Sequence, residues 1–458
     1  MTLPKQFLAS LQDVPGFDEK AFTAVHESGE QVTSIRINPA KHLPQTDHDS
    51  RLTTPVPWSS AGYYLPVRPS FTFDPLFHAG TYYVQEASSM FVEQALKQTV
   101  DLSQPLRVLD LCAAPGGKST LLQSLINKES LLVSNEVIKS RAVVLEENIT
   151  KWGAANVVVT NNDPAHFARL ENYFDVILID APCSGSGLFR KDPEAVNEWS
   201  ESNVQLCSQR QQRILADVWP ALKQEGILIY STCSYSKEED EMILDWICEA
   251  FKAEPKKLQI EREWQIIETI SEKSHAHGYR FYPDKIRGEG FFIGLVQKKH
   301  GADFAGTKPG KNKIERLSKA EEMIVRTWLQ HDADVILFKQ KDDIIALPSV
   351  LEKEIPVLQS AVYIKKAGVR VGKLAGKDLI PDHALALSSV INKSIARIEL
   401  NSQQAVQYLR RDEMPLHTNH RGWAIVGYDS YNLGWIKILP NRFNNYYPKE
   451  WRIIKQNT

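Results

Sequence analysis

Two cysteines and an aspartate carry the most distinctive chemistry in this sequence of 458 residues. Asp180 and Cys183 follow the apolar run Val176–Ile179, and Cys233 follows a second apolar run, Ile227–Tyr230. Unbroken aliphatic runs of this length are typical of strands buried on both faces of a parallel sheet. In open α/β sheets the ligand site lies beyond the carboxyl ends of the strands. We therefore expect all three side chains at the place where such folds do chemistry.

Two thiols in one pocket would suit methylation of C5 of a pyrimidine. If the two strands are neighbours they lie about 4.8 Å apart, and both thiols open into the same pocket. A thiolate that adds to C6 makes C5 nucleophilic, and a carboxylic acid at N3 stabilises the adduct. The second thiol can assist removal of the C5 proton and release of the product. The alternative to a catalytic cysteine is a structural one, with a small buried side chain, and we interpret Cys112, Cys207 and Cys248 in that way.

The segment Cys112–Lys118 indicates a cofactor site. Its small residues and two glycines let the backbone approach a ligand, and the following helix offers free N–H groups to an anion. The segment matches neither GxGxxG nor GxxxxGK[ST], which weakens a dinucleotide or nucleoside triphosphate interpretation. Glu136 and Asp163 follow the next two strands and could accept hydrogen bonds from a ribose diol and an adenine amine. Together these features favour a nucleoside with a carboxylate, such as S-adenosylmethionine.

The elements that must position these residues alternate between strands and helices. Such an alternation predicts an α/β fold with a mostly parallel sheet covered by helices. We expect strands over 107–112, 131–134, 156–160, 176–179, 227–230 and 290–297, and helices over 118–126, 139–152, 166–171, 194–222 and 237–251.

The chain divides into four predicted parts. Residues 1–75, with a short amphipathic start and a strand over 34–38, form a small accessory α+β domain for RNA binding. Residues 76–298 form the catalytic core, and 299–313 has the Gly, Pro and Lys composition of a linker. Residues 314–458 are β-rich after one helix over 319–329. We expect strands there over 361–364, 369–371, 422–428 and 433–438.

Composition narrows the class of protein. The chain is 43% hydrophobic and 24% charged, as in globular proteins, and has no apolar run long enough to cross a membrane. Five cysteines without a CxxC pair predict neither a disulfide framework nor a structural zinc site, and no signal peptide is evident, so we expect a cytoplasmic protein. Residues 301–458 carry 24 Lys and Arg against 17 Asp and Glu, or +7, which leaves −9 for residues 1–300. A basic second half favours nucleic acid, although ordinary charge scatter explains it equally well.

Five motifs resemble the Nop/Sun family of RNA cytosine-5 methyltransferases, in the order in which that family has them. They are Gln85-Glu-Ala-Ser-Ser, Asp110-Leu-Cys-Ala-Ala-Pro-Gly-Gly-Lys118, Asp180-Ala-Pro-Cys-Ser-Gly-Ser-Gly187, Ser231-Thr-Cys-Ser-Tyr-Ser-Lys-Glu-Glu-Asp-Glu241 and Gly288-Glu-Gly-Phe-Phe292. The resemblance covers roughly residues 76–298 and implies a Rossmann-like class I methyltransferase core.

The resemblance also implies a role for each site residue. Cys233 would be the nucleophile, Cys183 would assist product release, and Asp180 would be the acid at the base. DNA cytosine methyltransferases use a Pro-Cys nucleophile, which would nominate Cys183; the Thr-Cys pair ending at Cys233 favours RNA. The residues implied in S-adenosylmethionine binding are Cys112, Ala113, Ala114, Pro115, Gly116, Gly117, Lys118, Glu136, Asp163 and Asp180.

The C-terminal region resembles the RNA-binding PUA-like tail of bacterial ribosomal RNA members of the family. The similar segments are 368–372, 422–428, 433–437 and 444–448. We therefore expect an enzyme that acts on ribosomal RNA, the 16S RNA of the small subunit, or on a ribosomal subunit. We also expect a monomer without a metal. The alternatives are a transfer RNA methyltransferase and a non-catalytic RNA-binding assembly factor. Candidates for RNA contacts near the pocket, if they are not ordinary solvated charges, are Arg190, Lys191, Arg280 and Lys285.

Overall fold

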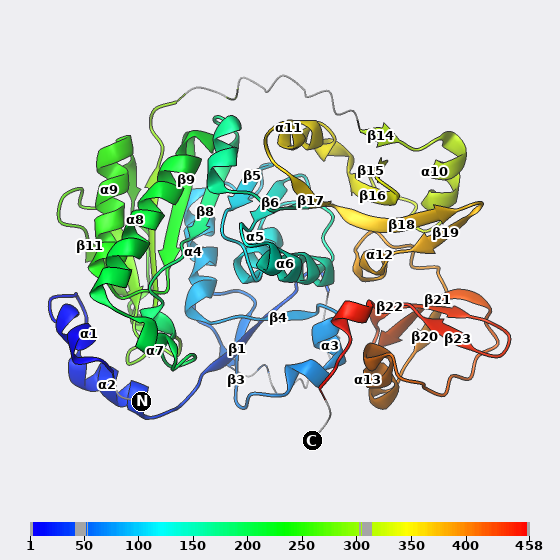
Figure 1. The fold of residues 1–458 in the computed structure, drawn as a ribbon, viewed down its shortest axis with the longest axis horizontal. Coiled ribbons are helices and arrows are strands. Elements are labelled where there is room, and N and C mark those ends of the chain that lie inside the picture. The colour runs from blue at the N-terminus through cyan, green and yellow to red at the C-terminus, as the bar shows by residue number, and fades with distance from the viewer. Residues whose placement is uncertain (1–2, 42–51, 53, 302–303, 305–313, 456–458) are drawn as a thin grey trace.

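The computed structural model of the chain describes residues 3–41, 52, 54–301, 304 and 314–455. The strands among these residues form four sheets, namely a large central sheet, one sheet in the N-terminal part and two in the C-terminal part (Figure 1). The predicted linker, 299–313, falls largely on residues 302–303 and 305–313, which lie outside the described residues. No helix in the described part is both long and apolar enough to span a membrane.

The central sheet has ten strands, and its five middle strands run parallel, as expected from the alternation in the sequence. In spatial order the strands are β11 (Ile267–Ile270), β12 (His277–Phe281), β13 (Phe291–Gln297), β9 (Leu222–Thr232), β8 (Phe174–Asp180), β5 (Arg107–Asp110), β6 (Leu131–Asn135), β7 (Val157–Thr160) and β17 (Ile364–Ala367), with β10 (Glu254–Lys256) paired to β13. β13 and β17 run antiparallel to the parallel strands beside them, β9 and β7.

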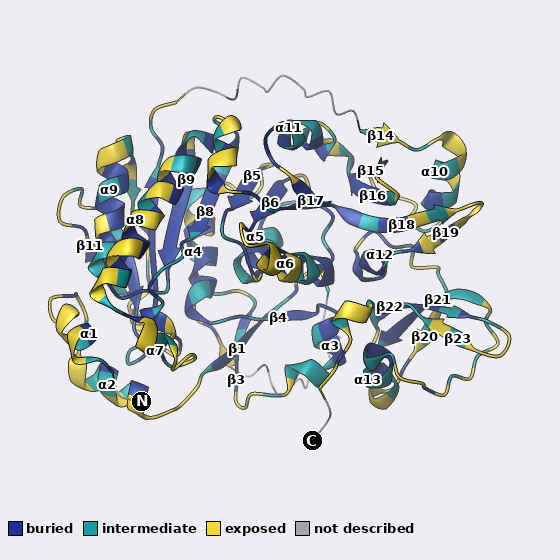
Figure 2. Ribbon diagram, viewed as in Figure 1, coloured by how far each residue is buried: buried dark blue, intermediate teal, exposed yellow. Residues whose placement is uncertain are grey.

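Both faces of the central sheet are buried, because successive side chains of a strand point to opposite faces. Leu109 packs into one hydrophobic cluster and its neighbour Val108 into the other. The same alternation separates Ile177 from Val176. Helices cover both faces, and the strands beneath them are mostly buried (Figure 2). These helices are α4 (Val92–Thr99), α5 (Gly117–Leu125), α6 (Lys139–Trp152), α8 (Glu201–Val218) and α9 (Glu241–Phe251). The short α7 (Ala195–Glu198) packs with α1 (Lys5–Ser10) and α2 (Glu19–Glu27) instead.

Three smaller sheets flank the core. The N-terminal sheet has the order β2 (Thr54–Pro55), β3 (Gly62–Leu65), β1 (Thr33–Ile37) and β4 (Tyr82–Val84), and it accompanies α1 (Lys5–Ser10), α2 (Glu19–Glu27) and α3 (Pro75–His78). The C-terminal part contains the sheet β14 (Glu315–Arg316), β15 (Val335–Gln340), β16 (Asp343–Pro348), β18 (Val369–Ala375) and β19 (Asp378–Pro381), and the sheet β20 (Arg397–Glu399), β21 (Gly422–Tyr428), β22 (Tyr431–Ile438) and β23 (Phe443–Asn445). Its helices are α10 (Lys319–Arg326), α11 (Glu354–Ala361), α12 (His383–Leu387) and α13 (Ser402–Arg410).

A segment from the C-terminal part completes the central sheet. β17 pairs with β7, with Ile364 opposite Thr160. The strand predicted over 361–364 is therefore wrong in its bounds, because Ala361 ends α11 and the strand begins at Ile364. The helix forms because Ile355, Leu358 and Ala361 recur at helical spacing and bury one face against the core.

We expect the α11 face to contribute to the stability of the central core. Leu358 is fully buried in the cluster that contains residues of β5, β6 and β8. Replacing it with alanine should lower the free energy of unfolding by about 2–5 kcal/mol through lost burial and a cavity. Denaturant unfolding followed by tryptophan fluorescence checks this. A separate second transition that alone responds to Leu358→Ala would mean that the C-terminal part folds independently, as the predicted division at 299–313 supposes.

Buried histidines lie where the N-terminal, core and C-terminal parts meet. His78 Nδ1 lies 3.1 Å from the hydroxyl of Tyr447, and His383 packs edge-on against Tyr447 and Trp451. Burial, together with the charge of Lys151, lowers the pKa of His78 to about 4 and that of His383 to about 3. The ring nitrogens of His383 have no hydrogen-bond partner among the described residues. Protonating either ring would thus place a charge inside this junction.

Acid should loosen this junction. A histidine whose pKa is lowered in the folded protein adds stability that is complete above pH 6.5 and is lost as the pH falls towards about 4. The loss is about 1.4 kcal/mol for each pH unit by which burial lowers one histidine's pKa. His383→Phe keeps a flat ring between Tyr447 and Trp451, so it should be as stable as the wild type at pH 7 and lose less stability at pH 4.5. Denaturant unfolding at both pH values measures this, and identical pH dependence of the two proteins would contradict it.

Candidate active site

The two cysteines that follow the parallel strands β8 and β9 meet in one place. The strands are direct neighbours, with Asp180 opposite Ser231 in the register. Cys233 comes directly after β9 ends, and Cys183 lies three residues beyond the end of β8. Their sulfur atoms are 3.0 Å apart, and both side chains are half-buried. The predicted proximity of the two thiols is confirmed.

Three backbone segments pack against one another directly beside Cys233. The N–H of Gly187 donates to the carbonyl of Cys233 at 2.7 Å, and the N–H of Gly290 donates to the carbonyl of Gly187 at 3.1 Å. A Cβ atom on Gly187 would lie 2.6 Å from the carbonyl oxygen of Gly290 and 2.7 Å from that of Cys233. The glycines in these motifs therefore allow an approach that a side chain would prevent.

Asp180 lies between the cysteine loops and the cofactor turn. Its Oδ1 accepts a hydrogen bond from Ser231 Oγ at 2.8 Å, and its Oδ2 lies 2.8 Å from Lys118 Nζ. Burial, the largest single effect, would lower the pKa of Lys118, but the charge and hydrogen bond of Asp180 and the charge of Asp110 together outweigh it and raise the pKa. Lys118 is thus protonated and places a positive charge beside the Asp180 carboxyl group.

The thiols differ in their electrostatic surroundings. The hydrogen bond with Cys233 and then burial raise the pKa of the Cys183 thiol well above its usual value, and the nearby carboxylate of Glu239 adds to the effect. Cys183 therefore holds a proton, which suits a group that exchanges protons rather than one that attacks. Burial also raises the pKa of Cys112, in agreement with its interpretation as a small residue lining the cofactor turn.

The predicted cofactor residues line the adjacent carboxyl ends of β5, β6 and β7. The turn 112–118 links β5 to α5, and Gly116 caps the helix with φ +118°. Buried Asp110 accepts from Ser119 Oγ at 2.7 Å, and burial raises its pKa to about 7. Arg141 and Asn148 of α6 each donate to a carbonyl of the turn at 2.8 Å, at Ala114 and Pro115 respectively.

The two acids beyond the next strands are held differently. Glu136 is buried; its Oε1 accepts from the N–H of Ile138 at 2.9 Å and its Oε2 lies 3.5 Å from Arg141. Asp163 is exposed and caps a short 3₁₀ helix by accepting from the N–H of Ala165 at 3.0 Å. A fixed buried carboxylate suits a ribose diol, and the free N–H groups at the start of α5 suit a carboxylate. These donors and acceptors fit S-adenosylmethionine.

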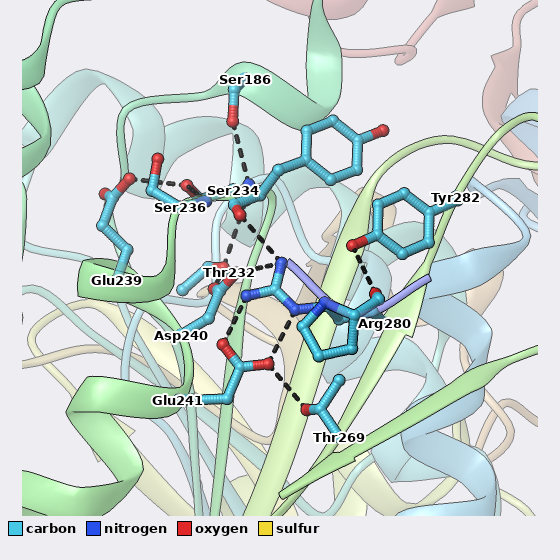
Figure 3. A network of polar contacts seen from close by, with 12 residues as sticks. Ser186, Thr232, Ser234, Ser236, Glu239, Asp240, Glu241, Thr269, Arg280 and Tyr282 are labelled. Atoms are coloured by element: carbon cyan, nitrogen blue, oxygen red, sulfur yellow. Dashed lines mark hydrogen bonds and ion pairs between the residues drawn. The ribbon is translucent and has the colours of Figure 1, made fainter. Parts of the chain in front are cut away.

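One predicted RNA contact is wrong. Arg280 is 1% exposed, and its guanidinium binds both oxygens of Glu241 and lies 3.1 Å from Asp240 (Figure 3). It also donates to the carbonyl of Tyr235 at 2.9 Å. Arg280 thus anchors the segment that follows Cys233 and has no donor left at the surface for a phosphate. The sequence did not reveal this buried ion pairing, because Arg280 lies in β12 whereas its partners Asp240 and Glu241 lie at the start of α9.

The other three candidates for RNA contacts are less completely buried and ion-paired than Arg280. Arg190 has a side chain that is 5% exposed, lies 3.6 Å from Glu289 and donates to the carbonyl of Gly288 at 3.3 Å. Lys285 pairs with Asp284 at 2.7 Å and is half-buried. Lys191 is exposed, and of the four it is the most available to a phosphate.

Sequence reasoning gave no role to Glu239, although this residue lies in one of the five motifs. Glu239 is fully buried and contacts both cysteine loops through Ser184 and Ser234. In the sequence alone, Glu239 follows several serines and lies at the start of the helix predicted over 237–251, a setting that is typical of a helix-capping residue. The usable signal was its place six residues after Cys233, in the same motif.

Family models match most of the chain in three consecutive pieces. The model described as 16S rRNA methyltransferase RsmB/F matches residues 97–297, the N-terminal domain of 16S rRNA methyltransferase RsmF matches 3–87, and the methyltransferase RsmF PUA domain matches 396–453. The third match agrees with the PUA-like tail expected from the sequence.

Named relatives and solved structures agree with these models. The chain is 31% identical to ribosomal RNA small subunit methyltransferase F of Aeromonas salmonicida, over 88% of this chain and 85% of the relative. It is 30% identical to the protein of that name from Klebsiella pneumoniae strain 342, over 92% and 89%. A methyltransferase homologue from Pyrococcus horikoshii is 28% identical, with a TM-score of 0.52 over 65% of this chain and all of that one. NSun6 from the same organism, solved with SFG, has the same fold at 19% identity and a TM-score of 0.54, over 65% of this chain and 99% of that one.

Proposed function

Because the chain belongs to the ribosomal RNA small subunit methyltransferase F family, we propose that it transfers a methyl group from S-adenosylmethionine to C5 of cytosine in 16S ribosomal RNA. The observation that carries this proposal is the Cys183–Cys233 sulfur pair, 3.0 Å apart, with Asp180 and Lys118 beside it. A thiolate and an acid are the two groups that activation of a pyrimidine at C5 requires.

Each residue has one task in the proposed reaction. The Cys233 thiolate forms a bond to C6 of the cytosine, and the π electrons of the C5–C6 bond move into the ring so that C5 becomes nucleophilic. The Asp180–Lys118 pair supplies the proton that N3 gains, because Lys118 Nζ is 2.8 Å from Asp180 Oδ2. S-adenosylmethionine supplies an electrophilic methyl group when it is bound. After transfer Cys183, once its own proton has passed to solvent, takes the C5 proton as a thiolate. The electrons of the C5–H bond re-form the C5–C6 double bond, the Cys233–C6 bond breaks to regenerate the Cys233 thiolate, and N3 returns its proton to the Asp180–Lys118 pair.

The cofactor would lie across the ends of β5, β6 and β7. Glu136 would accept hydrogen bonds from the ribose, and the N-terminal end of α5 would hold the carboxylate through its N–H groups and positive end. Asp163 would accept from the adenine amine. The relative NSun6 was solved with SFG, an analogue of S-adenosylmethionine, which supports the same class of cofactor here.

The flanking parts would hold the RNA. The PUA match at 396–453 and the net charge of +7 beyond residue 300 support contacts to phosphates, which position a nucleic acid without specifying its sequence. The target base would leave any stack in order to reach the pocket. We propose the division into 1–75, 76–298, 299–313 and 314–458 on the same basis, although β17 shares the central sheet.

The test is methyl transfer from labelled S-adenosylmethionine to defined RNAs. Label should appear on C5 of cytosine in 16S ribosomal RNA, either naked or in the small subunit, and bisulfite sequencing of cellular RNA with and without the protein should locate it. Label on transfer RNA instead would support the transfer RNA alternative. RNA binding without any label on cytosine would leave the non-catalytic assembly factor.

A further inference from the structure

A buried carboxylate lies directly behind the two cysteine loops. Glu239 ends a short 3₁₀ helix (Lys237–Glu239) between β9 and α9, and it has no exposed surface. Figure 3 shows its carboxylate beside Ser234 and Ser236, on the side of the Cys233 loop opposite Arg280. Its carboxylate hydrogen-bonds to neither cysteine sulfur. Glu239 can therefore affect the proposed reaction only through the residues that it holds in place.

Four hydrogen bonds converge on this carboxylate. Its Oε1 accepts from the N–H of Ser184 at 2.8 Å and from Gln211 Nε2 at 3.1 Å. Its Oε2 accepts from Ser184 Oγ at 2.5 Å and from Ser234 Oγ at 2.6 Å. Ser184 directly follows Cys183, and Ser234 directly follows Cys233. One side chain therefore binds the neighbour of each cysteine; we call it and its four donors the Glu239 network.

The Glu239 network holds the Cys183 loop more firmly than the Cys233 loop. Two donors come from Ser184, and Gln211 of α8 also donates to the carbonyl of Pro182 at 3.1 Å. The Cys233 loop contributes one donor, Ser234. That loop has further anchors of its own, because Thr232 Oγ donates to Asp240 at 2.7 Å and the carbonyl of Tyr235 accepts from Arg280. Losing Glu239 would thus release the Cys183 loop first.

We propose that Glu239 is a positioning residue that sets the separation of Cys183 and Cys233, and through it the release of the methylated base. The inference rests on the proposed function for its kinetic part. Hydrogen bonds to a buried carboxylate are strong, and removing the acceptor leaves buried donors unpaired, so the loops would move to satisfy them.

A dithiol probe tests the separation without any methyl transfer. Phenylarsine oxide bonds to two thiols that lie side by side and releases water from its oxygen and the two thiol protons. The full-length protein should retain one equivalent, and Cys183→Ser or Cys233→Ser should abolish that retention. Glu239→Ala should bind the probe on the order of tenfold more weakly or slowly. Glu239→Gln, which keeps one acceptor oxygen, should fall between this variant and the wild type.

The neighbouring glutamate provides a matched control. The side chain of Glu238 is half-buried and makes no hydrogen bond or ion pair within the described part of the chain, so Glu238→Gln changes the same charge without touching the loops. It should bind the probe as the wild type does. If Glu239→Ala does not fold, Glu239→Gln carries the test. Equal probe binding by Glu239→Gln, Glu238→Gln and the wild type would overturn the proposal.

A kinetic measurement separates positioning from a purely structural role. Because the Cys183 loop is released first, the Glu239 variants should form the RNA adduct but release it slowly, so that denaturing gels show more covalent adduct per turnover than the wild type. The KM for RNA should change little while kcat falls. Equal loss of adduct formation and turnover would mean that Glu239 only supports the fold. Absence of any adduct in Cys183→Ala would refute the proposed function instead, and the probe would still decide on Glu239.

Discussion

Methyl transfer by the Cys233→Ala variant is expected to fall by on the order of 10³-fold or more, to the background of the assay. Without a thiolate at C6 the C5 carbon has no nucleophilic character, so no other group in the site can replace the step. The side chain is half-buried at the end of β9, and its removal leaves the Asp180–Lys118 pair in place. Binding of S-adenosylmethionine, followed by calorimetry, should therefore stay close to that of the wild type.

A matched cysteine shows whether the effect belongs to the site. Cys248 is buried in α9, away from the sulfur pair, and burial raises the pKa of its thiol to about 11. Cys248→Ala should retain methyl transfer within a few-fold of the wild type. If Cys233→Ala and Cys248→Ala lose activity to the same extent, the loss reflects damage to the fold and Cys233 is not the nucleophile.

The Cys183→Ala variant should accumulate a covalent complex between protein and RNA that survives denaturing gel electrophoresis. In the proposed order of steps, Cys183 acts after methyl transfer, by taking the C5 proton as the Cys233–C6 bond breaks. Its thiol is 3.0 Å from that of Cys233, and its raised pKa makes its thiolate a strong base for the C5 proton. Without it the Cys233 adduct forms but decays slowly, so turnover should fall by about 10²-fold or more.

Three variants decide the assignment of the two cysteines. The adduct should be absent from Cys233→Ala and from the double variant that lacks both thiols, and it should require RNA that contains the target cytosine. An adduct trapped by Cys233→Ala and not by Cys183→Ala would mean that the roles are reversed, as in enzymes with a Pro-Cys nucleophile.

Much of the catalytic centre could be predicted from local sequence. The aliphatic runs before Asp180 and Cys233 gave the two strands, and the rule that sites lie beyond strand ends gave the pocket. The parallel pairing itself did not follow from the runs, because a one-dimensional pattern does not say which strands are neighbours. That the two strands are neighbours was an assumption of the sequence analysis, and the register of Asp180 with Ser231 confirms it.

The wrong predictions share one cause, which is that contacts between segments far apart in the sequence decided the outcome. Arg280 was expected at the surface because arginine usually is, yet Glu241 and Asp240 compensate its charge inside the protein. The strand near Ile364 was placed too early, since α11 could be recognised only by the core face that it covers. β17 joins the central sheet from beyond the predicted linker, a pairing across roughly two hundred residues.

By itself the sequence determined the alternating strands and helices, the candidates for reactive side chains and their order along the chain. These follow from short-range physics, because apolar periodicity, turns and caps depend on residues close in sequence. Only the tertiary structure decided which charges are buried in pairs, that Glu239 binds both cysteine loops, and that the C-terminal part completes the core. Those facts depend on contacts between distant segments, whose energies exist only after the chain has brought the partners together.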